Sequence, residues 1–329
     1  MKDKSSLAAL RAQILSKTRH FFESRGFVEI QTPVMVKNPG LEPHLLYFET
    51  QFNPSMGGGQ KETWFLPTSP EYHLKKALAW GLPKIFEICK SFRNGEKSEE
   101  HEPEFLMLEW YRSPGDYQQI ARDTEELILA LGQHFHPSKS WGPAKHITVA
   151  EAFHKFCNLN LDEALRPGGR SLTQQARAAG YKSIGTIDTF EDAFNKLLVE
   201  YIEPQLGNHG PEFLWDYPAA FAALSRPHPE RPHYCERFEV YVDGIELANA
   251  FGELMDPAAL RGVCLKDQAQ RMRLYGKSPP LDEEFLDAVG ASPHKNVGGI
   301  ALGLDRLIQV LIDADTLQDA MLFPKWTTK

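Results

Sequence analysis

The sequence predicts an α+β fold, and three observations support this prediction. Residues 86–93 and 104–111 have the β-rich, apolar character of strands, and the polar loop between them indicates an antiparallel hairpin. Apolar residues at helical spacing occur both before and after this hairpin. A chain of 329 residues with 42% hydrophobic content can also bury the core of one large domain, with or without an insertion.

The composition disfavours several classes of protein. No apolar run approaches the length of a membrane span, and the first ten residues lack the apolar core of a secretory signal, so we expect a cytoplasmic protein that does not enter a membrane. With 36 Lys and Arg against 44 Asp and Glu, the formal charge of −8 disfavours a broad nucleic-acid-binding surface. The four cysteines never form C-x-x-C, which indicates isolated thiols rather than a zinc ribbon or a disulfide framework.

The loop between the two predicted strands is the first candidate for a ligand site. It is far longer than a hairpin needs, and long loops on rigid strands are usually functional. Arg93, at the end of the first strand, can bind a phosphate through two parallel hydrogen bonds. Phe105, twelve residues later, offers a flat surface for a purine. These features predict contact with a ligand here.

The remaining elements follow from helix and turn signals. Apolar spacing over 7–22 predicts a first helix, with Ser5 or Ser6 as its N-cap and Gly26 as its stop. The glycines at 57–59 predict a flexible tip to which we assign no chemistry, because no strand-to-helix signature surrounds them.

Several later helices are also predicted. Helical segments are expected at 70–80 and 256–276, and residues 113–235 are expected to be mostly helical. Two capping-box patterns mark helix starts within that segment: Thr148 with Glu151, and Asp188 with Glu191.

Three histidines in the proline-rich segment 203–234 raise the question of a metal site. His209, His228 and His233 are separated by 19 and 5 residues, which matches no standard metal-binding motif. We therefore expect no metal at these histidines.

Four segments resemble the motifs of one family, the class II aminoacyl-tRNA synthetases, and specifically its lysyl branch. S-F-R-N-G-E with H-E-P-E-F and L-E-W-Y (91–111) resembles motif 2, and G-G-I-A-L-G-L-D-R-L (298–307) resembles motif 3. E-R-F-E-V-Y-V-D-G-I-E-L-A-N-A-F-G-E-L (236–254) is similar to the strands that carry metal-binding and substrate-binding carboxylates. F-V-E-I-Q-T-P (27–33) looks like motif 1, which implies a homodimer.

The resemblance implies a fold and a domain organisation. It implies a class II synthetase catalytic core, a mostly antiparallel β-sheet flanked by helices, over residues 1–329. The mostly helical segment at about 113–235 would be an insertion in this core. The core begins almost at residue 1, which leaves no room for the N-terminal anticodon-binding barrel of lysyl-tRNA synthetases.

The resemblance also implies adenylate formation from ATP with Mg²⁺. Arg93 and Arg306 would be catalytic, on the α-phosphate and the γ-phosphate side, and Phe105 and Arg306 would enclose the adenine. Glu239 and Glu246 would bind magnesium, brought together by a turn at 243–244. The implied ATP-binding residues are Arg93, Asn94, Glu96, His101, Glu102, Phe105, Glu246, Leu247, Gly303 and Arg306.

The implied amino-acid pocket selects a cationic side chain. Glu253 and Tyr111 match positions that hold a lysine ε-ammonium, with Glu109 as a supporting acid, and Glu71 matches the residue that faces the substrate amino group. A buried carboxylate at such a position needs a cation as its partner. The implied substrate-binding residues are Ser69, Pro70, Glu71, Glu109, Tyr111, Asn249, Glu253 and Ala301.

Two features favour the shortened paralogues in this family, the elongation factor P lysine ligases. One is the missing room for an anticodon-binding barrel. The other is Ala301, which occupies a position where lysyl-tRNA synthetases have Gly, so its methyl group would reshape the floor of the pocket. This resemblance implies activation of (R)-β-lysine, with lysine a poorer substrate, and transfer to a lysine ε-amine of elongation factor P. No tRNA is expected as the acceptor.

Three alternatives remain open at this point. A lysine-activating enzyme close to lysyl-tRNA synthetase fits the same motifs. An ammonia-dependent asparagine synthetase would need a cation for an aspartate side chain, and Glu253 with Tyr111 argues against it. A regulatory paralogue without catalysis is disfavoured by Arg93 and Arg306. It is favoured by departures from the family pattern: Gly95 displacing Glu96 by one position, Glu102 where Asn is common, Ala250 for Gly, and Gly252 for His or Ser.

Overall fold

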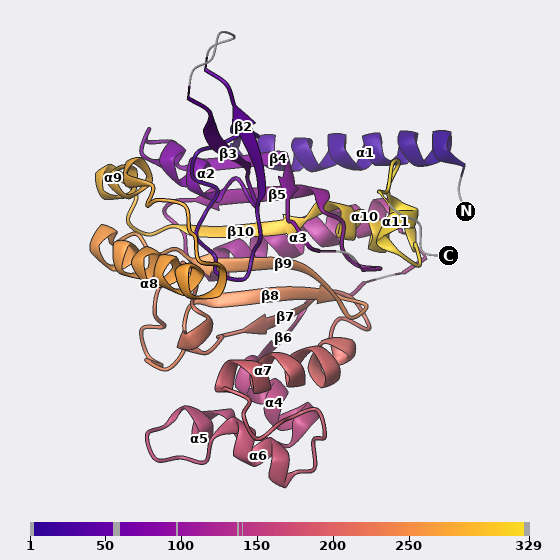
Figure 1. Cartoon of the computed structure of the whole chain (residues 1–329). Coiled ribbons are helices and arrows are strands. Elements are labelled where there is room, and N and C mark those ends of the chain that lie inside the picture. The colour runs from indigo at the N-terminus through magenta and orange to yellow at the C-terminus, as the bar shows by residue number, and fades with distance from the viewer. Residues whose placement is uncertain (1–2, 55–59, 97, 137, 140, 326–329) are drawn as a thin grey trace.

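One mostly antiparallel sheet organises the molecule (Figure 1). The computed structural model describes residues 3–54, 60–96, 98–136, 138–139 and 141–325, so the predicted glycine tip at 57–59 lies outside the described residues. Within the described residues, neighbouring strands are parallel only at the two edges of this sheet, β1 with β4 and β6 with β7. The strand order is β1 (Val28–Glu29), β4 (Lys84–Phe92), β5 (Glu104–Arg112), β10 (Gly298–Gly303), β9 (Ile245–Gly252), β8 (Arg237–Val242), β7 (Glu212–Trp215) and β6 (Lys145–Thr148). The α+β prediction is confirmed.

The predicted hairpin is present as β4 and β5, paired from Lys84 with Arg112 to Phe92 with Glu104. Because side chains alternate along a strand, Phe86 and Trp110 point to one face of the sheet together with Ile300 of β10. This face is buried in the main hydrophobic core. The helices that pack on it are α1 (Lys4–Glu23), α3 (Tyr117–Phe135) and α10 (Leu304–Ile312), and α11 (Leu317–Ala320) follows α10. The other face of the sheet carries a smaller hydrophobic cluster, which includes Ile85 and Tyr111, and beside it polar side chains.

The first helix begins earlier than the sequence suggested. Asp3 is the N-cap of α1, since its carboxylate accepts hydrogen bonds from the backbone N–H groups of Ser5 and Ser6. The prediction that Ser5 or Ser6 caps this helix is therefore wrong. An ionised side chain that accepts two backbone N–H bonds is the stronger cap.

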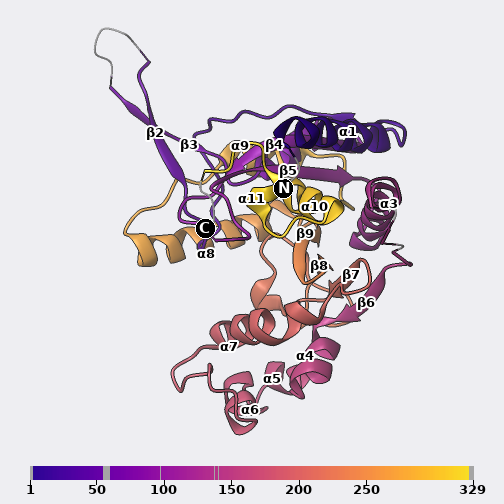
Figure 2. The same ribbon diagram turned by 90° about the vertical axis from the view of Figure 1, so that its right-hand side faces the viewer.

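Helices and helical turns make up about half of the segment 113–235, and two of its strands, β6 and β7, extend the main sheet. Apart from α3, which packs on the main core, its helices surround a second hydrophobic core and lie at the end of the molecule opposite α1 (Figure 2). These helices are α4 (Val149–Cys157), α5 (Leu161–Leu165), α6 (Leu172–Ala178) and α7 (Phe190–Leu197), followed by a π-helical turn (Leu198–Ile202) and short 3₁₀ turns (Glu203–Gln205, Ala219–Phe221).

The two capping-box predictions in this segment have different outcomes. The box formed by Thr148 and Glu151 at the start of α4 is confirmed. The box predicted at Asp188 and Glu191 is wrong by one residue, because Thr189 and Asp192 form it instead. Asp188 accepts a backbone hydrogen bond from Gly185 and one from the Lys196 ammonium, so its carboxylate is already engaged.

The remaining elements lie around the polar face of the sheet. The helix predicted at 256–276 is present as α8, with Asp256 as its N-cap and Gly276 in a left-handed conformation at its end. A two-stranded hairpin projects from the body (Figures 1 and 2). The elements are α2 (Glu71–Leu78), α8 (Pro257–Tyr275), α9 (Glu283–Ala291), and the hairpin strands β2 (Phe48–Phe52) and β3 (Glu62–Leu66).

The structure adds three observations, on the helices, on the cysteines and on one of the three histidines in segment 203–234. None of the helices formed by the described residues combines the length and the apolar character that crossing a membrane requires. All four cysteines are free thiols, and three of them are buried. His228 serves a local turn, since its ring accepts hydrogen bonds from the backbone N–H groups of Glu230 and Arg231.

A buried ion pair fastens α1 to α10. The Arg11 guanidinium lies 2.6 Å from the Asp305 carboxylate and also donates to the carbonyl of Ala320 at 2.7 Å. Asp305 accepts a further hydrogen bond from the backbone N–H of Leu106 at 2.7 Å. The pair therefore joins the first helix, the β5 strand and the C-terminal helices.

We expect Arg11→Ala to lower the free energy of unfolding by about 3 kcal/mol, because the buried Asp305 carboxylate would lose its cation. Denaturant titration measures this change. The matched control is Lys277→Ala, which removes an exposed ion pair with Glu49 and should alter stability by less than about 0.5 kcal/mol. A change of similar size in both variants would contradict the structural role given to Arg11.

Candidate active site

The polar face of the sheet carries a row of functional side chains across four neighbouring strands. Glu109 of β5 pairs with Ala301 of β10, Ala301 pairs with Asn249 of β9, and Asn249 pairs with Glu239 of β8. Residues paired in this way project to the same face. The register alone therefore brings together four residues that are up to 192 positions apart in the sequence.

A turn and a β-bulge determine which side chains of β9 point to this polar face of the sheet. The turn predicted at 243–244 is present, with both residues at positive φ, and it places Glu246 opposite Tyr241 on the face of Glu239. Glu246 and Asn249 are three residues apart, which in a regular strand would put them on opposite faces. A bulge shifts the register between Val240 and Tyr241, and both side chains reach the polar face.

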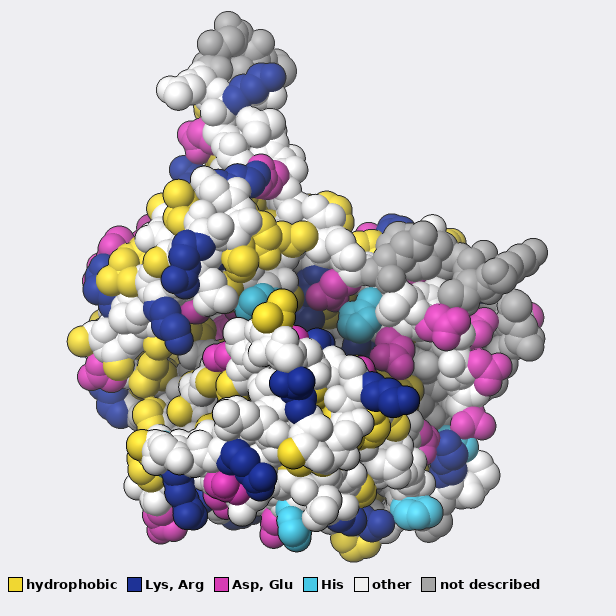
Figure 3. Space-filling model, turned by 60° about the horizontal axis from the view of Figure 1, so that its bottom comes forward, with side chains coloured by type: hydrophobic (Ala, Val, Ile, Leu, Met, Phe, Trp, Pro, Cys, Tyr) yellow, Lys and Arg dark blue, Asp and Glu magenta, His cyan; other side chains and the backbone are white. Residues whose placement is uncertain are grey.

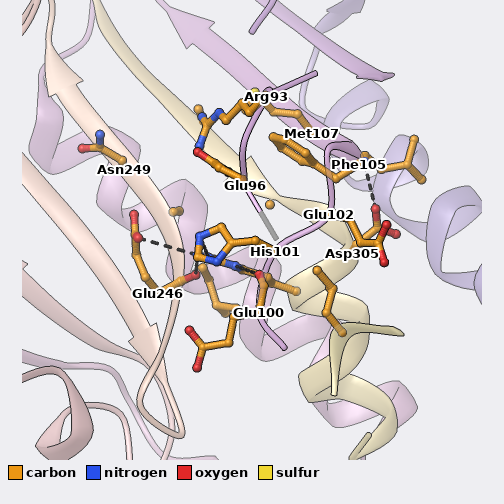
Figure 4. Close-up of a pocket in the computed structure, with 17 residues that line it drawn as sticks. Arg93, Glu96, Glu100, His101, Glu102, Phe105, Met107, Glu246, Asn249 and Asp305 are labelled. Atoms are coloured by element: carbon orange, nitrogen blue, oxygen red, sulfur yellow. Dashed lines mark hydrogen bonds and ion pairs between the residues drawn. The ribbon is translucent and has the colours of Figure 1, made fainter. Parts of the chain in front are cut away.

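A first cavity of about 190 Å³ opens on this face. Charged and histidine side chains gather around a hollow below the β2–β3 hairpin (Figure 3). In the close-up, Arg93 and Glu96 lie on one side of the cavity, and His101 and Glu246 lie on the other (Figure 4). The predicted ATP-binding residues that line it are Arg93, Glu96, His101, Glu102, Phe105, Glu246, Leu247, Gly303 and Arg306.

One predicted ATP-binding residue lies outside this lining. The Asn94 side chain donates to the carbonyl of Tyr47 at 3.3 Å, and its backbone N–H donates to the carbonyl of Leu46 at 3.0 Å. Asn94 therefore anchors the loop after β4 to the segment before β2. The structure gives it a positioning contact rather than a place in the cavity wall.

Arg306 is held in the first turn of α10. Its guanidinium donates to the carbonyl of Glu246 at 2.7 Å and lies 2.9 Å from the His101 ring nitrogen. Burial, and then the charge of Arg306, lower the pKa of His101 below its usual range. A neutral His101 ring can accept the hydrogen bond from Arg306, so this contact orients the guanidinium without compensating its charge. The ion-pair partner of Arg306 is the Glu246 carboxylate, 3.6 Å away.

Arg93 is the less compensated of the two cations. It follows β4, its backbone is tied to Pro103, and its guanidinium lies 5.3 Å from the centre of the Phe105 ring. Within the described part of the chain it has no ion-pair partner, and its buried Nε atom has no hydrogen-bond acceptor. A half-buried cation without an ion-pair partner at the wall of a cavity is suited to binding an anionic ligand.

A second cavity of about 150 Å³ adjoins the first. The two have four lining residues in common: Arg93, Met107, Asn249 and Ala301. The predicted substrate-binding residues that line the second cavity are Ser69, Glu71, Glu109, Tyr111, Asn249, Glu253 and Ala301. Pro70 is instead the N-cap residue of α2 and sets the start of the helix that carries Glu71.

A buried lysine joins two acids of the second cavity. Lys75 is 1% exposed, and its ammonium lies 2.6 Å from the carboxylates of both Glu71 and Glu253. The Tyr111 hydroxyl donates to Glu109 at 2.6 Å. Gly299 gives Glu253 its space, since a Cβ there would lie 2.2 Å from the Glu253 carboxylate.

Sequence reasoning missed Lys75, although a signal for it exists. Lys75 follows Glu71 by four residues on α2, which is the spacing of a helical ion pair. A buried Glu253 also requires a cation within the protein whenever no substrate is bound. The two arguments together would have selected Lys75.

Carboxyl groups outnumber cationic groups around the second cavity, even with Lys75 counted. Burial raises the pKa of Glu253 to about 7, against the opposing effect of Lys75. Burial, and then the charge of Glu71, raise the pKa of Glu109 well above its usual range. Carboxyl groups that hold protons so strongly indicate a site that favours an added cation.

The predicted metal-binding acids differ in how they are engaged. Arg237 donates to one oxygen of Glu239 at 2.6 Å, and the hydroxyls of Tyr241 and Tyr217 donate to the other. Glu239 does not line the first cavity, whereas Glu246 does, with a side chain that is 38% exposed. Among the described residues, no group of three or more His, Cys, Asp or Glu side chains is arranged to hold a metal by itself.

Glu203 is a third acid near these two, and sequence reasoning did not identify it. The Tyr241 hydroxyl, which donates its proton to Glu239 at 2.6 Å, lies 3.3 Å from the Glu203 carboxylate. Burial, and then the charges of Glu239 and Glu246, raise the pKa of Glu203 to about 7. Burial, and then the charge of Glu239, raise the pKa of Glu246 to about 6. The negative potential around these three acids fits a cation.

Comparison with known proteins identifies the family. The family model described as tRNA synthetases class II (D, K and N) matches residues 2–327. The chain belongs to this class II family. A protein of Salmonella paratyphi B named elongation factor P–(R)-β-lysine ligase is 35% identical over 317 residues, which cover 95% of this chain and 93% of that protein. A protein of the same name from Erwinia tasmaniensis is 35% identical over 315 residues, with the same coverage of both chains.

Membership of the class II tRNA synthetase family confirms the predicted fold and class of enzyme. The chain is an ATP-dependent amino-acid ligase built on the class II synthetase core. In this class II enzyme the first cavity, with its two arginines, adjoins the acid-lined second cavity at Arg93.

We expect Arg93→Ala to reduce amino-acid-dependent ATP–pyrophosphate exchange by a factor of about 10³, since it removes the unpaired cation between the two cavities. The control is Arg273→Ala, because Arg273 is exposed on α8. Exchange in Arg93→Ala at the level of this control would remove Arg93 from the active site.

We expect amino-acid affinity to depend on the ionisation of Glu253. Its pKa of about 7 means that it is protonated in acid and becomes an anion above neutrality, so a cationic substrate binds more tightly as the pH rises from 6 to 8. The Michaelis constant for lysine should fall about tenfold over this range in the wild type, and Glu253→Gln should raise it and flatten its pH profile. A wild-type constant independent of pH would contradict this assignment.

Proposed function

We propose that this class II enzyme activates (R)-β-lysine, and lysine less well, as an aminoacyl adenylate and transfers it to a lysine ε-amine of elongation factor P. The named relatives in Salmonella and Erwinia support this acceptor and this substrate. The observation that carries the proposal is the junction at Arg93 of a cavity suited to a nucleotide with a cavity suited to a cationic side chain.

The chemistry requires positioning more than acid–base catalysis. A carboxylate oxygen of the amino acid attacks the α-phosphorus of ATP, and pyrophosphate leaves in line. Because the nucleophile is already an anion at neutral pH, the residues have to orient the two reactants and neutralise phosphate charge. Arg93 and Arg306 supply that charge, and Phe105 supplies a ring surface for the adenine.

Magnesium is part of this proposal. Glu246 would bind it from the wall of the first cavity, with Glu239 beside it. The raised pKa of Glu246 supports this, because it reports negative potential that a cation would relieve. A bound magnesium ion would neutralise charge on the phosphates, with water completing its oxygen ligands.

The preference for β-lysine over lysine rests on the floor of the second cavity. Ala301 lies between Glu109 and Asn249 in the sheet, and it lines both cavities. Its methyl group fills space at the point where the carboxylate end of a substrate would approach Arg93. In β-lysine the amino group lies one carbon further from the carboxylate than in lysine. We propose that β-lysine therefore fits beside the Ala301 methyl group better than lysine does.

The acceptor and the assembly are also proposals. The charge of −8 supports a protein acceptor rather than a tRNA. Exposed apolar side chains at Val28, Val34 and Met35, around the motif 1 segment, support a homodimer. We propose the cytoplasm as its compartment, because elongation factor P acts with ribosomes.

An asparagine synthetase is the second candidate, since the second cavity does contain a cation. Lys75 is nevertheless bound to both Glu71 and Glu253, so its charge is already compensated. Away from Arg93, where the substrate carboxylate would lie, an aspartate side chain would meet acids instead of a free cation. This arrangement favours a cationic substrate.

ATP–pyrophosphate exchange with separate amino acids tests the proposed function. We expect exchange with (R)-β-lysine to exceed exchange with lysine, and no exchange with aspartate, because the second cavity is acidic. Transfer to elongation factor P is then measured as a mass increase on one lysine of that protein. Exchange with aspartate alone would identify an asparagine synthetase. Exchange with none of the three amino acids would identify a regulatory paralogue without catalysis.

A further inference from the structure

The loop between β1 and β2 carries a carboxylate that the motifs do not identify. Glu42 lines the second cavity together with Glu71, Glu109 and Glu253. Its Oε2 atom is buried and has no hydrogen-bond partner among the described residues. The same is true of Oε2 of Glu109, a residue that is only 1% exposed. Two unpartnered carboxylate oxygens in one cavity call for donors from a ligand.

The backbone that carries Glu42 is held from behind. Arg271 of α8 donates to the carbonyls of Glu42 at 2.7 Å and Leu45 at 2.8 Å, and its guanidinium packs over the Tyr47 ring at 4.0 Å. The Tyr47 hydroxyl in turn donates to the carbonyl of Gly40 at 2.8 Å. Binding a ligand at Glu42 therefore requires little ordering of this loop.

Gly40 makes the position of the Glu42 carboxylate possible. Its φ of +109° is a conformation that side chains disfavour, and a Cβ at Gly40 would lie 2.4 Å from Oε2 of Glu42. The carboxylate folds back over the glycine and stays in the cavity wall.

Glu42 and Glu109 have no ion-pair partner among the described residues, and Glu42 also lacks a hydroxyl donor. Lys75 is bound to Glu71 and Glu253, and the Tyr111 hydroxyl serves Glu109. Burial, and then the charge of Glu71, raise the pKa of Glu42 to about 7. The charged and titratable groups around Glu42 are Glu71 and Tyr72 on α2, Arg93 after β4, Asp267 and Arg271 on α8, and Tyr47.

The position of Glu42 along the cavity decides which part of a substrate it meets. The substrate carboxylate has to lie near Arg93, where the two cavities meet, and Arg93 is close enough to influence the charge of Glu42. Glu253 and Glu109 accompany Tyr111 and Lys75 instead. An amino group one or two carbons from the carboxylate would therefore lie on the Glu42 side.

We propose that Glu42, with Glu71, binds the substrate ammonium group nearest the carboxylate, so that the enzyme recognises its amino acid as a diammonium. This inference rests on the proposed function for the identity of the substrate. It adds a specificity-determining residue from a loop outside the family motifs, and it assigns the two ammonium groups to separate acids, Glu42 and Glu253.

Calorimetric binding with two ligands tests this assignment. Lysine carries both ammonium groups, whereas 6-aminohexanoate has the same carboxylate and distal ammonium but lacks the proximal one. Glu42→Gln should weaken lysine binding by about 10- to 100-fold, the loss typical of a charged hydrogen bond, and leave 6-aminohexanoate binding unchanged. Glu253→Gln should weaken the binding of both ligands.

Controls separate this effect from misfolding and from a failure of the proposed function. Glu49→Gln, on the exposed strand β2, should change neither affinity, and Glu42→Asp, which keeps the charge, should restore part of the lysine affinity. Equal losses for both ligands in Glu42→Gln would overturn the assignment. ATP–pyrophosphate exchange assays on the same proteins test the proposed function independently. A wild-type enzyme that binds lysine but supports no exchange with any amino acid would contradict the proposed function. The binding result for Glu42 would still stand.

Discussion

The double ion pair of Lys75 is the interaction on which the second cavity depends. Carboxylates buried together without a cation would cost several kcal/mol each, and they would take up protons instead of remaining charged. Lys75 extends from α2 to reach Glu71 on its own helix and Glu253 just beyond β9. It therefore allows an acidic cavity to exist in the folded protein before any substrate arrives.

The two faces of the sheet have different roles: one packs in the main hydrophobic core, and the other carries the side chains that line the cavities. On one face, apolar side chains such as Phe86, Trp110 and Ile300 form the main core. On the other, the same strands present Glu109 and Asn249 to the cavities. Because side chains alternate along each strand, packing on the first face fixes the chemistry on the second. The bulge in β9 is the exception that brings Asn249 and Glu246 to the same side.

Much of this arrangement could be predicted from the sequence, because it depends on local signals. The β4–β5 hairpin, the turn at 243–244 and the helix capped by Asp256 all follow from alternation, turn chemistry and capping. Resemblance to the family motifs also identified most residues of the two cavities. The roles of Lys75 and Glu42 could not be predicted in this way, since a buried ion pair and an unpartnered oxygen depend on which distant segments meet. The errors at Ser5 and Asp188 arose where several polar residues competed for one cap.

The contact between α1 and Asp305 has a consequence for nucleotide binding. Asp305 directly precedes Arg306, it lines the first cavity, and it holds the backbone of Leu106 next to Phe105. When the amino-terminal helix frays, Asp305 loses Arg11, and the supports of both Phe105 and Arg306 loosen together. With the adenine bound as proposed, local unfolding of α1 and release of the purine would be thermodynamically linked, although the helix itself does not line the cavity.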